Sequence, residues 1–282
     1  MTPNLYPPKN NPVTLSHRRA GMSNDHDRSD TARPQAPGPG YDAGPARRLS
    51  FMRDLFNRSA QQYDQVNRLF SLGSGAWYRR FCLRRAGLRP GMKVVDIAVG
   101  TGLLAREAVA LTGDRRAVTG IDVSEAMLAI AQKKLGIFLI QGAAEALPLA
   151  PDIADFVTMG YALRHVADLE AAFREALRIL RPGGSIVLLE MSAPRYRLTR
   201  VLAAAYIGGL LPLLALVMTR DRRARALMRY HWETIASYMP PDAVLRVMAG
   251  SGFQHLKCTN EFDLFQFYTG KKPKDAAWLL SP

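Results

Sequence analysis

Apolar and polar positions along the chain follow two different periods. From about Leu49 to Phe70, large apolar residues recur at helical spacing, which predicts an amphipathic helix. After Gly87 the pattern changes to short, continuous apolar runs that end in glycine or in a polar residue. Such runs are typical of strands that are buried on both faces of a parallel sheet.

The runs alternate with amphipathic segments of helical period. Helices are expected at 103–111, 124–135 and 169–180, and strands at 94–98, 117–122, 137–141, 156–159 and 185–191. This alternation predicts an α/β fold built on a mostly parallel sheet. A ligand is then expected at the carboxyl ends of the strands, near the point where the strand order reverses.

Composition sets the limits of the folded region. Residues 1–46 are polar and rich in proline, so we expect a disordered tail, followed by one domain over 47–282. Two cysteines, Cys82 and Cys258, exclude a disulfide framework, and the start of the chain has no apolar signal-peptide core, so we expect a cytoplasmic protein. The net charge of +14 is compatible with an anionic partner or with a solvated, arginine-rich surface.

The first expected strand ends in a glycine turn between two carboxylates. Asp96 ends the strand, Gly100 and Gly102 form the turn, and Asp122 ends the second strand 20 residues after Gly102. Glycines allow close backbone approach to a ligand, and Asp122 is placed to accept ribose hydroxyls. A dinucleotide would fit the glycine spacing, but its pyrophosphate would be repelled by Asp96. The α-ammonium of S-adenosylmethionine would be attracted, so this cofactor is preferred.

Motifs on both sides of this turn resemble the UbiE family of C-methyltransferases of ubiquinone and menaquinone biosynthesis, from about Arg53 to Lys272. The matching segments, in the family's order, are Phe56-Asn57-Arg58-Ser59-Ala60-Gln61-Gln62-Tyr63-Asp64, Trp77-Tyr78-Arg79-Arg80, Ala144-Glu145-Ala146-Leu147-Pro148, Ala162-Leu163-Arg164, Leu180-Arg181-Pro182-Gly183-Gly184 and Leu189-Glu190-Met191-Ser192.

The resemblance implies a Rossmann-like class I S-adenosylmethionine-dependent methyltransferase fold with an apolar helical lid at about 195–238. It also implies a polyprenyl quinone or quinol substrate, with Arg164 placed to fix a ring oxygen. His165 replaces the family's amide with an imidazole that can exchange a proton near neutrality or ligate a metal. The expected cofactor-binding residues are Tyr63, Asp96, Ala98, Gly100, Thr101, Gly102, Asp122, Val123, Ala143, Ala144 and Gly160.

Several positions near the cofactor depart from the family pattern. Ala143 stands where a side-chain acceptor for adenine is usual, Gly160 where serine is common, and His165 where asparagine follows the Leu-Arg pair. The Ala98-Val99-Gly100-Thr101-Gly102 turn and the segment Tyr230-His231-Trp232-Glu233-Thr234-Ile235 resemble the rhodoquinone-biosynthesis branch, RquA. This resemblance implies an amino group taken from S-adenosylmethionine with the help of manganese. Methylation and amination therefore both stay open. Metal ligands, if any, are unknown; the candidates are His165, His231, Asp168 and Glu190.

An uncharged segment of 19 residues, Val201–Thr219, lies between arginine-rich flanks. Its length is borderline for a bilayer span, and Gly208, Gly209 and Pro212 predict a bent or broken helix. Three interpretations follow: a lid that dips into a membrane, a buried lid or dimer contact, and a true span. The first predicts peripheral association with the inner membrane. A second aromatic and basic patch, Trp77 to Arg85, is either a membrane contact or an ordinary helix.

Other functions compete with quinone modification. A nucleic-acid-modifying enzyme would explain the charge but not the uncharged segment, and the sequence has no nucleic-acid-binding module, so no nucleic-acid partner is expected. A methyltransferase acting on another lipophilic molecule and a non-catalytic protein that binds S-adenosylmethionine are further alternatives. The sequence does not predict the oligomeric state.

Overall fold

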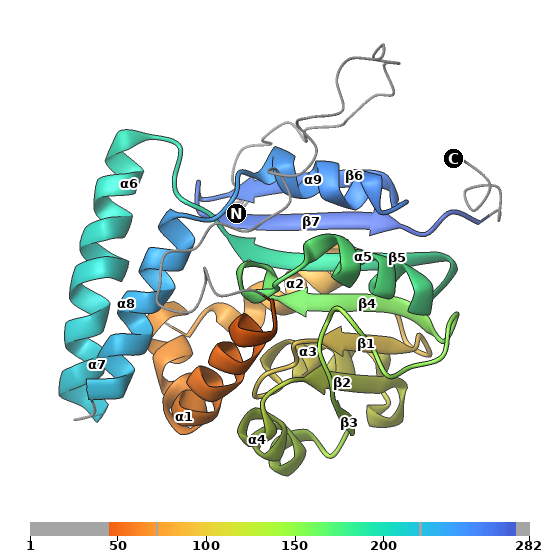
Figure 1. The fold of residues 1–282 in the computed structure, drawn as a ribbon, viewed down its shortest axis with the longest axis horizontal. Helices are drawn as coiled ribbons and strands as arrows, with labels where there is room; N and C mark the ends of the chain where they lie inside the picture. Colours follow the sequence, from red (N-terminus) through yellow and green to blue (C-terminus); the bar gives the residue numbers. More distant parts are fainter. Residues whose placement is uncertain (1–44, 72, 220–221, 275–282) are drawn as a thin grey trace, which may run out of the picture.

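One seven-stranded sheet forms the centre of the fold (Figure 1). The computed structural model describes residues 45–71, 73–219 and 222–274. The strand order is β3-β2-β1-β4-β5-β7-β6, in which β7 runs antiparallel to the other six strands. The strands are β1 (Val94–Ile97), β2 (Val118–Asp122), β3 (Phe138–Gln141), β4 (Ala154–Gly160), β5 (Leu180–Met191), β6 (Gln254–Glu261) and β7 (Phe265–Lys271).

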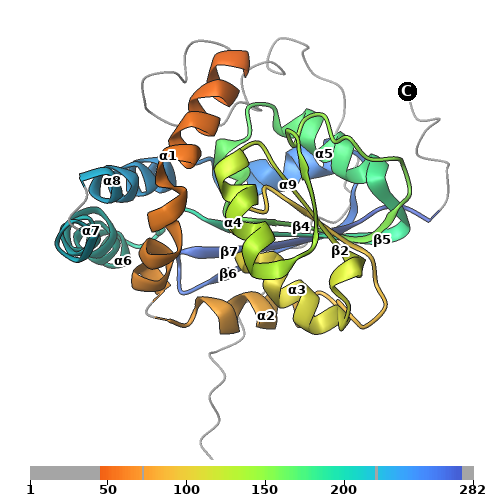
Figure 2. The same ribbon diagram turned by 90° about the horizontal axis from the view of Figure 1, so that it is seen from below.

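Helices cover both faces of the sheet, as the view along the sheet in Figure 2 shows. Apolar side chains of α5 and α9 pack on one face, and those of α2 and α3 pack on the other. The helices are α1 (Pro45–Ser71), α2 (Gly75–Arg85), α3 (Leu103–Thr112), α4 (Glu125–Leu135), α5 (Leu169–Ile179), α6 (Arg197–Ala203), α7 (Leu211–Thr219), α8 (Arg222–Ala236) and α9 (Pro241–Gly250), with short 3₁₀ turns at Arg115–Ala117 and Leu163–His165.

All five predicted strands and all three predicted α/β helices are present, with ends that differ by a few residues. The sequence pattern missed β6, β7 and α9. Strand β6 lies at the sheet edge, and its residues are exposed or half-buried except for one buried position, Cys258, which pairs with β7. Of the predicted disordered tail, 1–46, residues 1–44 lie outside the described residues.

Helix α1 lies across the carboxyl ends of the strands and is fixed to the start of α4. The side-chain oxygen Oδ1 of Asn57 accepts hydrogen bonds from Ser124 Oγ (2.6 Å) and from the Ala126 amide (3.2 Å). Asn57 therefore holds α1 over the loop that follows β2, where the sequence places the ligand site.

The predicted lid is a helical hairpin at one end of the molecule (Figure 1). Helices α6 and α7 are joined without a break by a π-helical turn, Ala204–Leu210, so the predicted break is wrong. The π-helical turn precedes Pro212, which has no amide hydrogen to donate. A β-carbon on Gly208 would lie 2.9 Å from the Trp232 ring, so this glycine allows close packing against α8.

The outer face of this helix is apolar and exposed. Leu198 is 71%, Val201 65% and Leu202 60% exposed. The segment Arg197–Val217 has the length and mean hydropathy, 1.9, of a membrane-crossing helix, and only 22% of its most apolar window is buried. The interpretation as a wholly buried lid is therefore wrong for the single chain.

Candidate active site

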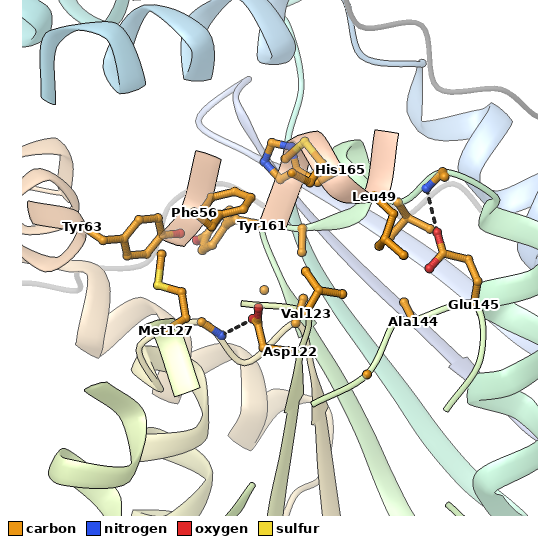
Figure 3. Close-up of a pocket in the computed structure, with 18 residues that line it drawn as sticks. Leu49, Phe56, Tyr63, Asp122, Val123, Met127, Ala144, Glu145, Tyr161 and His165 are labelled. Atoms are coloured by element: carbon orange, nitrogen blue, oxygen red, sulfur yellow. Dashed lines mark hydrogen bonds between the residues drawn. The ribbon is translucent and has the colours of Figure 1, made fainter. Parts of the chain in front are cut away.

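A pocket opens at the carboxyl ends of the strands, where the sequence analysis predicted it. Its floor comes from the loops after β1, β2 and β4, and its roof from α1. Figure 3 shows Tyr63, Phe56 and His165 on one side of this pocket and Asp122 and Val123 on the other. The predicted residues that line it are Tyr63, Ala98, Gly100, Asp122, Val123, Ala144 and Gly160.

Asp122 ends β2 and orders the glycine turn. Its Oδ2 accepts a hydrogen bond from the Gly100 amide (2.8 Å), and its Oδ1 accepts one from the Ser124 amide (2.9 Å). Burial raises the pKa of this carboxyl, although the backbone amides oppose the effect. Each carboxylate oxygen has a second lone pair, and the pair of oxygens faces the pocket, as ribose recognition requires.

Asp96 lines a smaller, adjoining pocket with Thr101, Tyr63 and Tyr161. Its Oδ1 accepts a hydrogen bond from Thr158 Oγ1 (2.6 Å), while its buried Oδ2 has no hydrogen bond of standard geometry with the described residues. Burial raises its pKa to about 7, despite the opposing hydrogen bonds. A buried carboxylate oxygen without a partner fits the α-ammonium of S-adenosylmethionine, so the residues present fit this cofactor.

Two predicted cofactor residues, Gly102 and Ala143, do not line either pocket. Gly102 has a φ of 85°, and a β-carbon there would lie 2.5 Å from Leu135. Its role is thus to allow α3 to pack against α4. Thr101, which lines the smaller pocket, also contacts the roof, because its Oγ1 donates a hydrogen bond to Asp64 of α1 (2.5 Å).

A second, mostly apolar pocket adjoins the first and shares Tyr63 with it. It contains about 990 Å³ of empty space including its open mouth. Aromatic and apolar side chains from α1, α2, α8 and the β6–β7 hairpin form most of its wall. Its lining residues include Tyr63, Phe70, Trp77, Arg79, Tyr161, Arg164, Met228, His231, Phe262 and Phe265.

Arg164 provides the polar end of this second pocket. It is buried and forms an ion pair with Glu190 of β5, which is itself fully buried. Arg164 Nε also donates a hydrogen bond to Thr234 Oγ1 of α8 (3.2 Å). Burial alone would lower the pKa of Arg164, but the charge of Glu190 reverses the effect and raises it. The guanidinium is therefore a fixed positive charge.

His231 of α8 lies beside Arg164, with its Nδ1 atom 3.3 Å from Arg164 Nη2. Burial, and then the charge of Arg164, lower the pKa of His231 to about 3. The imidazole is thus neutral near pH 7. Since a guanidinium nitrogen only donates, Nδ1 must accept, which assigns the ring proton to Nε2. His231 is therefore a hydrogen-bond donor at the wall of the second pocket.

His165 follows β4 on the predicted cofactor side of the sheet. It lines the cofactor pocket rather than the second pocket, and its Nδ1 lies 3.0 Å from the Tyr230 hydroxyl. Its ring also packs edge-on against Phe56 (5.3 Å between centroids). Arg164 and His165 are adjacent in a 3₁₀ turn, Leu163–His165. Because the backbone turns there, their side chains point to different pockets.

The four candidate metal ligands do not come together. Glu190 pairs with Arg164, and Asp168 accepts a hydrogen bond from the Ala171 amide at the start of α5 (2.9 Å). His165 and His231 line different pockets. The described residues contain no group of three His, Cys, Asp or Glu side chains that could hold a metal ion.

Sequence reasoning missed Arg79, Tyr161 and Phe56 as pocket residues. Tyr161 has a φ of 60°, which is unusual for a non-glycine residue, and it directly follows β4. Arg79 and Phe56 lie on helices whose inward faces only tertiary packing defines. His231 was singled out, but as a metal ligand.

Comparison with known proteins gives the chain a family. Residues 46–262 match the sequence model of the ubiE/COQ5 methyltransferase family. The ubiquinone/menaquinone biosynthesis C-methyltransferase UbiE of Shewanella sediminis is 34% identical over 216 residues, which cover 74% of this chain and 85% of that protein. The protein of the same name from Shewanella halifaxensis is 32% identical and covers 77% and 88% of the two chains.

Solved structures agree on the fold. A methyltransferase from Thermotoga maritima, described as a possible histamine N-methyltransferase, matches with a TM-score of 0.55 and 22% identity, covering 78% of this chain and 99% of that one. Phosphoethanolamine N-methyltransferase 2 of Haemonchus contortus, solved with S-adenosyl-L-methionine, has a TM-score of 0.55 and 16% identity, covering 78% and 60%. The predicted fold, transferase activity and S-adenosylmethionine cofactor are confirmed. The chain belongs to the ubiE/COQ5 methyltransferase family.

Proposed function

We propose that this protein transfers a methyl group from S-adenosylmethionine to a ring carbon of a polyprenyl quinol. The observation that carries the proposal is the junction of the two pockets. Tyr63 and Tyr161 border both the cofactor pocket and the apolar second pocket, so a ring in the second pocket would lie next to the reacting end of the cofactor. The names of the UbiE relatives, which denote quinone C-methylation, support the same substrate class.

The second pocket has the chemistry that a quinol needs. Its apolar wall suits the ring and the first isoprenoid units, and its polar end offers Arg164 and His231 to ring oxygens. When bound, S-adenosylmethionine supplies an electrophilic methyl group. Arg164 stabilises the phenolate that makes the neighbouring ring carbon nucleophilic, since a fixed buried cation acts strongly on developing negative charge. Nε2–H of His231 orients the ring by donating a hydrogen bond.

Among the described residues that line the second pocket there is no carboxylate, and the only imidazole has its Nδ1 facing Arg164. Proton removal is therefore assigned to solvent rather than to a side chain. In this scheme the protein accelerates the reaction by positioning the two substrates and by electrostatic stabilisation.

Amination of the ring is a second candidate, favoured by one specific feature of the cofactor pocket. His165 reaches this pocket, and Gly160 offers no polar side chain there, so the cofactor meets contacts unlike those of a usual family member. The product separates the two reactions. Methylation adds a methyl group to the ring, whereas amination replaces a methoxy group by an amine.

The test is an assay of the purified protein with S-adenosylmethionine and short-chain quinols or ubiquinones in detergent, followed by mass spectrometry. We expect a ring-methylated product and S-adenosylhomocysteine without added metal. An aminoquinone that forms only with added manganese would replace this proposal by the second one. Methylation of a lipophilic compound other than a quinone would retain the reaction but overturn the substrate class. Binding of the cofactor without turnover would support a non-catalytic role.

We further propose that the α6–α7 lid contacts the cytoplasmic face of the inner membrane. Its exposed apolar residues form one face of a continuous helix, and Arg195, Arg197 and Arg200 are exposed at its start. An apolar helix face next to arginines fits the interface of an anionic membrane. Since the inner face of the same hairpin contributes Met228 and His231 to the second pocket, a lipid-borne quinol would enter where the lid meets the membrane.

A further inference from the structure

One arginine of α2 is buried while its neighbours are exposed. Arg79 is 8% exposed, in contrast to Arg80, Arg84 and Arg85. Arg80 pairs with Glu107 (2.8 Å), and Arg85 pairs with Glu261 (2.9 Å). Arg79 forms no ion pair with any carboxylate of the described residues, and the contact that defines its position is with the Tyr161 ring, whose centroid lies 5.5 Å from the guanidinium carbon.

A buried guanidinium without an anion is energetically costly, because the charge loses its hydration and gains little in return. The Arg79 guanidinium lies close to the backbone of Gly75, because a β-carbon on Gly75 would be only 2.8 Å from Arg79 Nη1. The glycine therefore provides the space that this buried side chain occupies. Such an arrangement suggests that the partner of Arg79 is a ligand.

The small pocket next to the glycine turn gives the ligand's chemistry. Arg79 and Asp96 both line it, together with Tyr63, Thr101 and Tyr161. Asp96 is a buried acid whose Oδ2 has no hydrogen bond of standard geometry with the described residues. One pocket thus holds a buried cation and a buried anion. The two charges attract each other, but neither forms an ion pair with a described residue.

A group with a positive and a negative charge close together would satisfy both side chains. The methionyl end of S-adenosylmethionine is such a group, with an α-ammonium and an α-carboxylate on one carbon. We infer that Arg79 binds the α-carboxylate of S-adenosylmethionine, opposite the α-ammonium held by Asp96. A guanidinium is suited to this role because it donates two parallel hydrogen bonds to a carboxylate.

Two other assignments compete with this one. The carboxylate could be held by backbone amides at the start of α3, which follows the glycine turn. Alternatively, Arg79 could serve the second substrate, because it also borders the apolar pocket. Binding of the cofactor alone, without quinone, distinguishes all three.

The experiment compares S-adenosylmethionine with its decarboxylated analogue, which keeps the ammonium and lacks only the carboxylate. Calorimetry with the whole protein, without quinone, gives both affinities for the wild type, Arg79→Met, Arg79→Lys and Arg80→Met. Arg79→Met should weaken binding of S-adenosylmethionine by at least roughly tenfold and leave the analogue within about threefold of its wild-type affinity. Arg79→Lys should recover part of the loss, and Arg80→Met, an exposed control, should change neither affinity.

Asp96→Asn should instead weaken binding of both S-adenosylmethionine and the decarboxylated analogue, since both carry the ammonium. Thermal melting of each variant verifies the fold. Equal weakening of the two ligands by Arg79→Met would show that Arg79 only shapes the pocket, and the assignment would be overturned. Unchanged affinity for both ligands would overturn it too, and would assign the carboxylate to the α3 backbone.

Discussion

Asp96→Asn should change stability and cofactor affinity in opposite directions. Asp96 is 1% exposed, and burial raises its pKa from an ordinary 3.8 to about 7. One pKa unit corresponds to about 1.4 kcal/mol, so the ionised carboxylate costs the cofactor-free protein on the order of 4 kcal/mol above about pH 7. Asparagine has nearly the same shape and removes this charge.

The net gain is smaller than the full cost. Thr158 can still donate a hydrogen bond to the amide oxygen of asparagine, but the amide nitrogen is then buried without an acceptor, which costs about 1–3 kcal/mol. A gain of about 2 kcal/mol remains, equivalent to roughly 4–8 °C in melting temperature for a domain of this size.

The gain should depend on pH in a defined direction. Because the folded-state pKa lies above the unfolded one, the folded wild type holds an extra proton between about pH 4 and pH 7 and loses stability as pH rises through this window. The melting temperatures of wild type and Asp96→Asn should therefore be closest at about pH 5 and differ fully at about pH 8.

Cofactor binding should respond in the opposite sense. The α-ammonium needs the ionised carboxylate, so wild-type affinity should increase with pH up to about 7 and then level off. Truncation of one partner of a buried ion pair costs about 2–5 kcal/mol, so Asp96→Asn should lose roughly 30-fold or more in affinity, with little dependence on pH.

Differential scanning fluorimetry and calorimetry at several pH values measure both effects. Asp155→Asn is the control, because it removes an ion-paired carboxylate at the amino end of β4. It should lower the melting temperature and leave cofactor binding unchanged. Wild-type cofactor affinity in Asp96→Asn, or a stability difference that is the same at both pH values, would refute the reasoning.

Four further outcomes are expected. Asp122→Ala removes the proposed ribose acceptor and should weaken S-adenosylmethionine binding by at least roughly tenfold, about 1.4 kcal/mol, by calorimetry; unchanged affinity would contradict the role. Arg164→Ala leaves Glu190 buried without its partner and should destabilise the fold by about 3–5 kcal/mol in denaturant unfolding, whereas a loss below about 1 kcal/mol would argue against the ion pair. His231→Phe should lower turnover by roughly tenfold and leave cofactor affinity within about threefold. Since the pKa of His231 is about 3, its loss should remove no inflection from the pH–rate profile near neutrality, and a missing inflection would disprove the assignment of His231 as a neutral donor. Leu202→Glu should release the protein from anionic vesicles in sedimentation, whereas Phe138→Glu, equally exposed on β3, should not; equal binding of both variants would count against the membrane contact.

The cofactor half of the site was predictable because its residues are fixed by local geometry. Asp96 and Asp122 end neighbouring parallel strands, so both carboxylates must lie at the same edge of the sheet. Two of the predicted residues, Gly102 and Ala143, line neither of the pockets at this edge. Gly102 instead allows α3 and α4 to pack closely.

The second pocket could not be predicted in the same way. Arg164 and His165 are adjacent in sequence, but one side chain lines the second pocket and the other the cofactor pocket, and a 3₁₀ turn decides which. His231 becomes a neutral donor because α8 buries it and brings it to Arg164, 67 positions away in the chain. No periodicity in α8 signals this contact, which depends on how the lid hairpin packs.

The residues that line the cofactor pockets and those that line the second pocket come from different parts of the fold. The sheet and its loops supply Asp96 and Asp122, which line the proposed cofactor pockets. The side chains that line the second pocket, such as Trp77, Met228 and His231, come from α2 and α8, which pack around the sheet rather than belong to it. Changes in these helices can alter the acceptor while the fold and the cofactor remain. Methylation and amination of a quinone ring are therefore best distinguished by the side chains of α8 and the Leu163–His165 turn, not by the glycine motif.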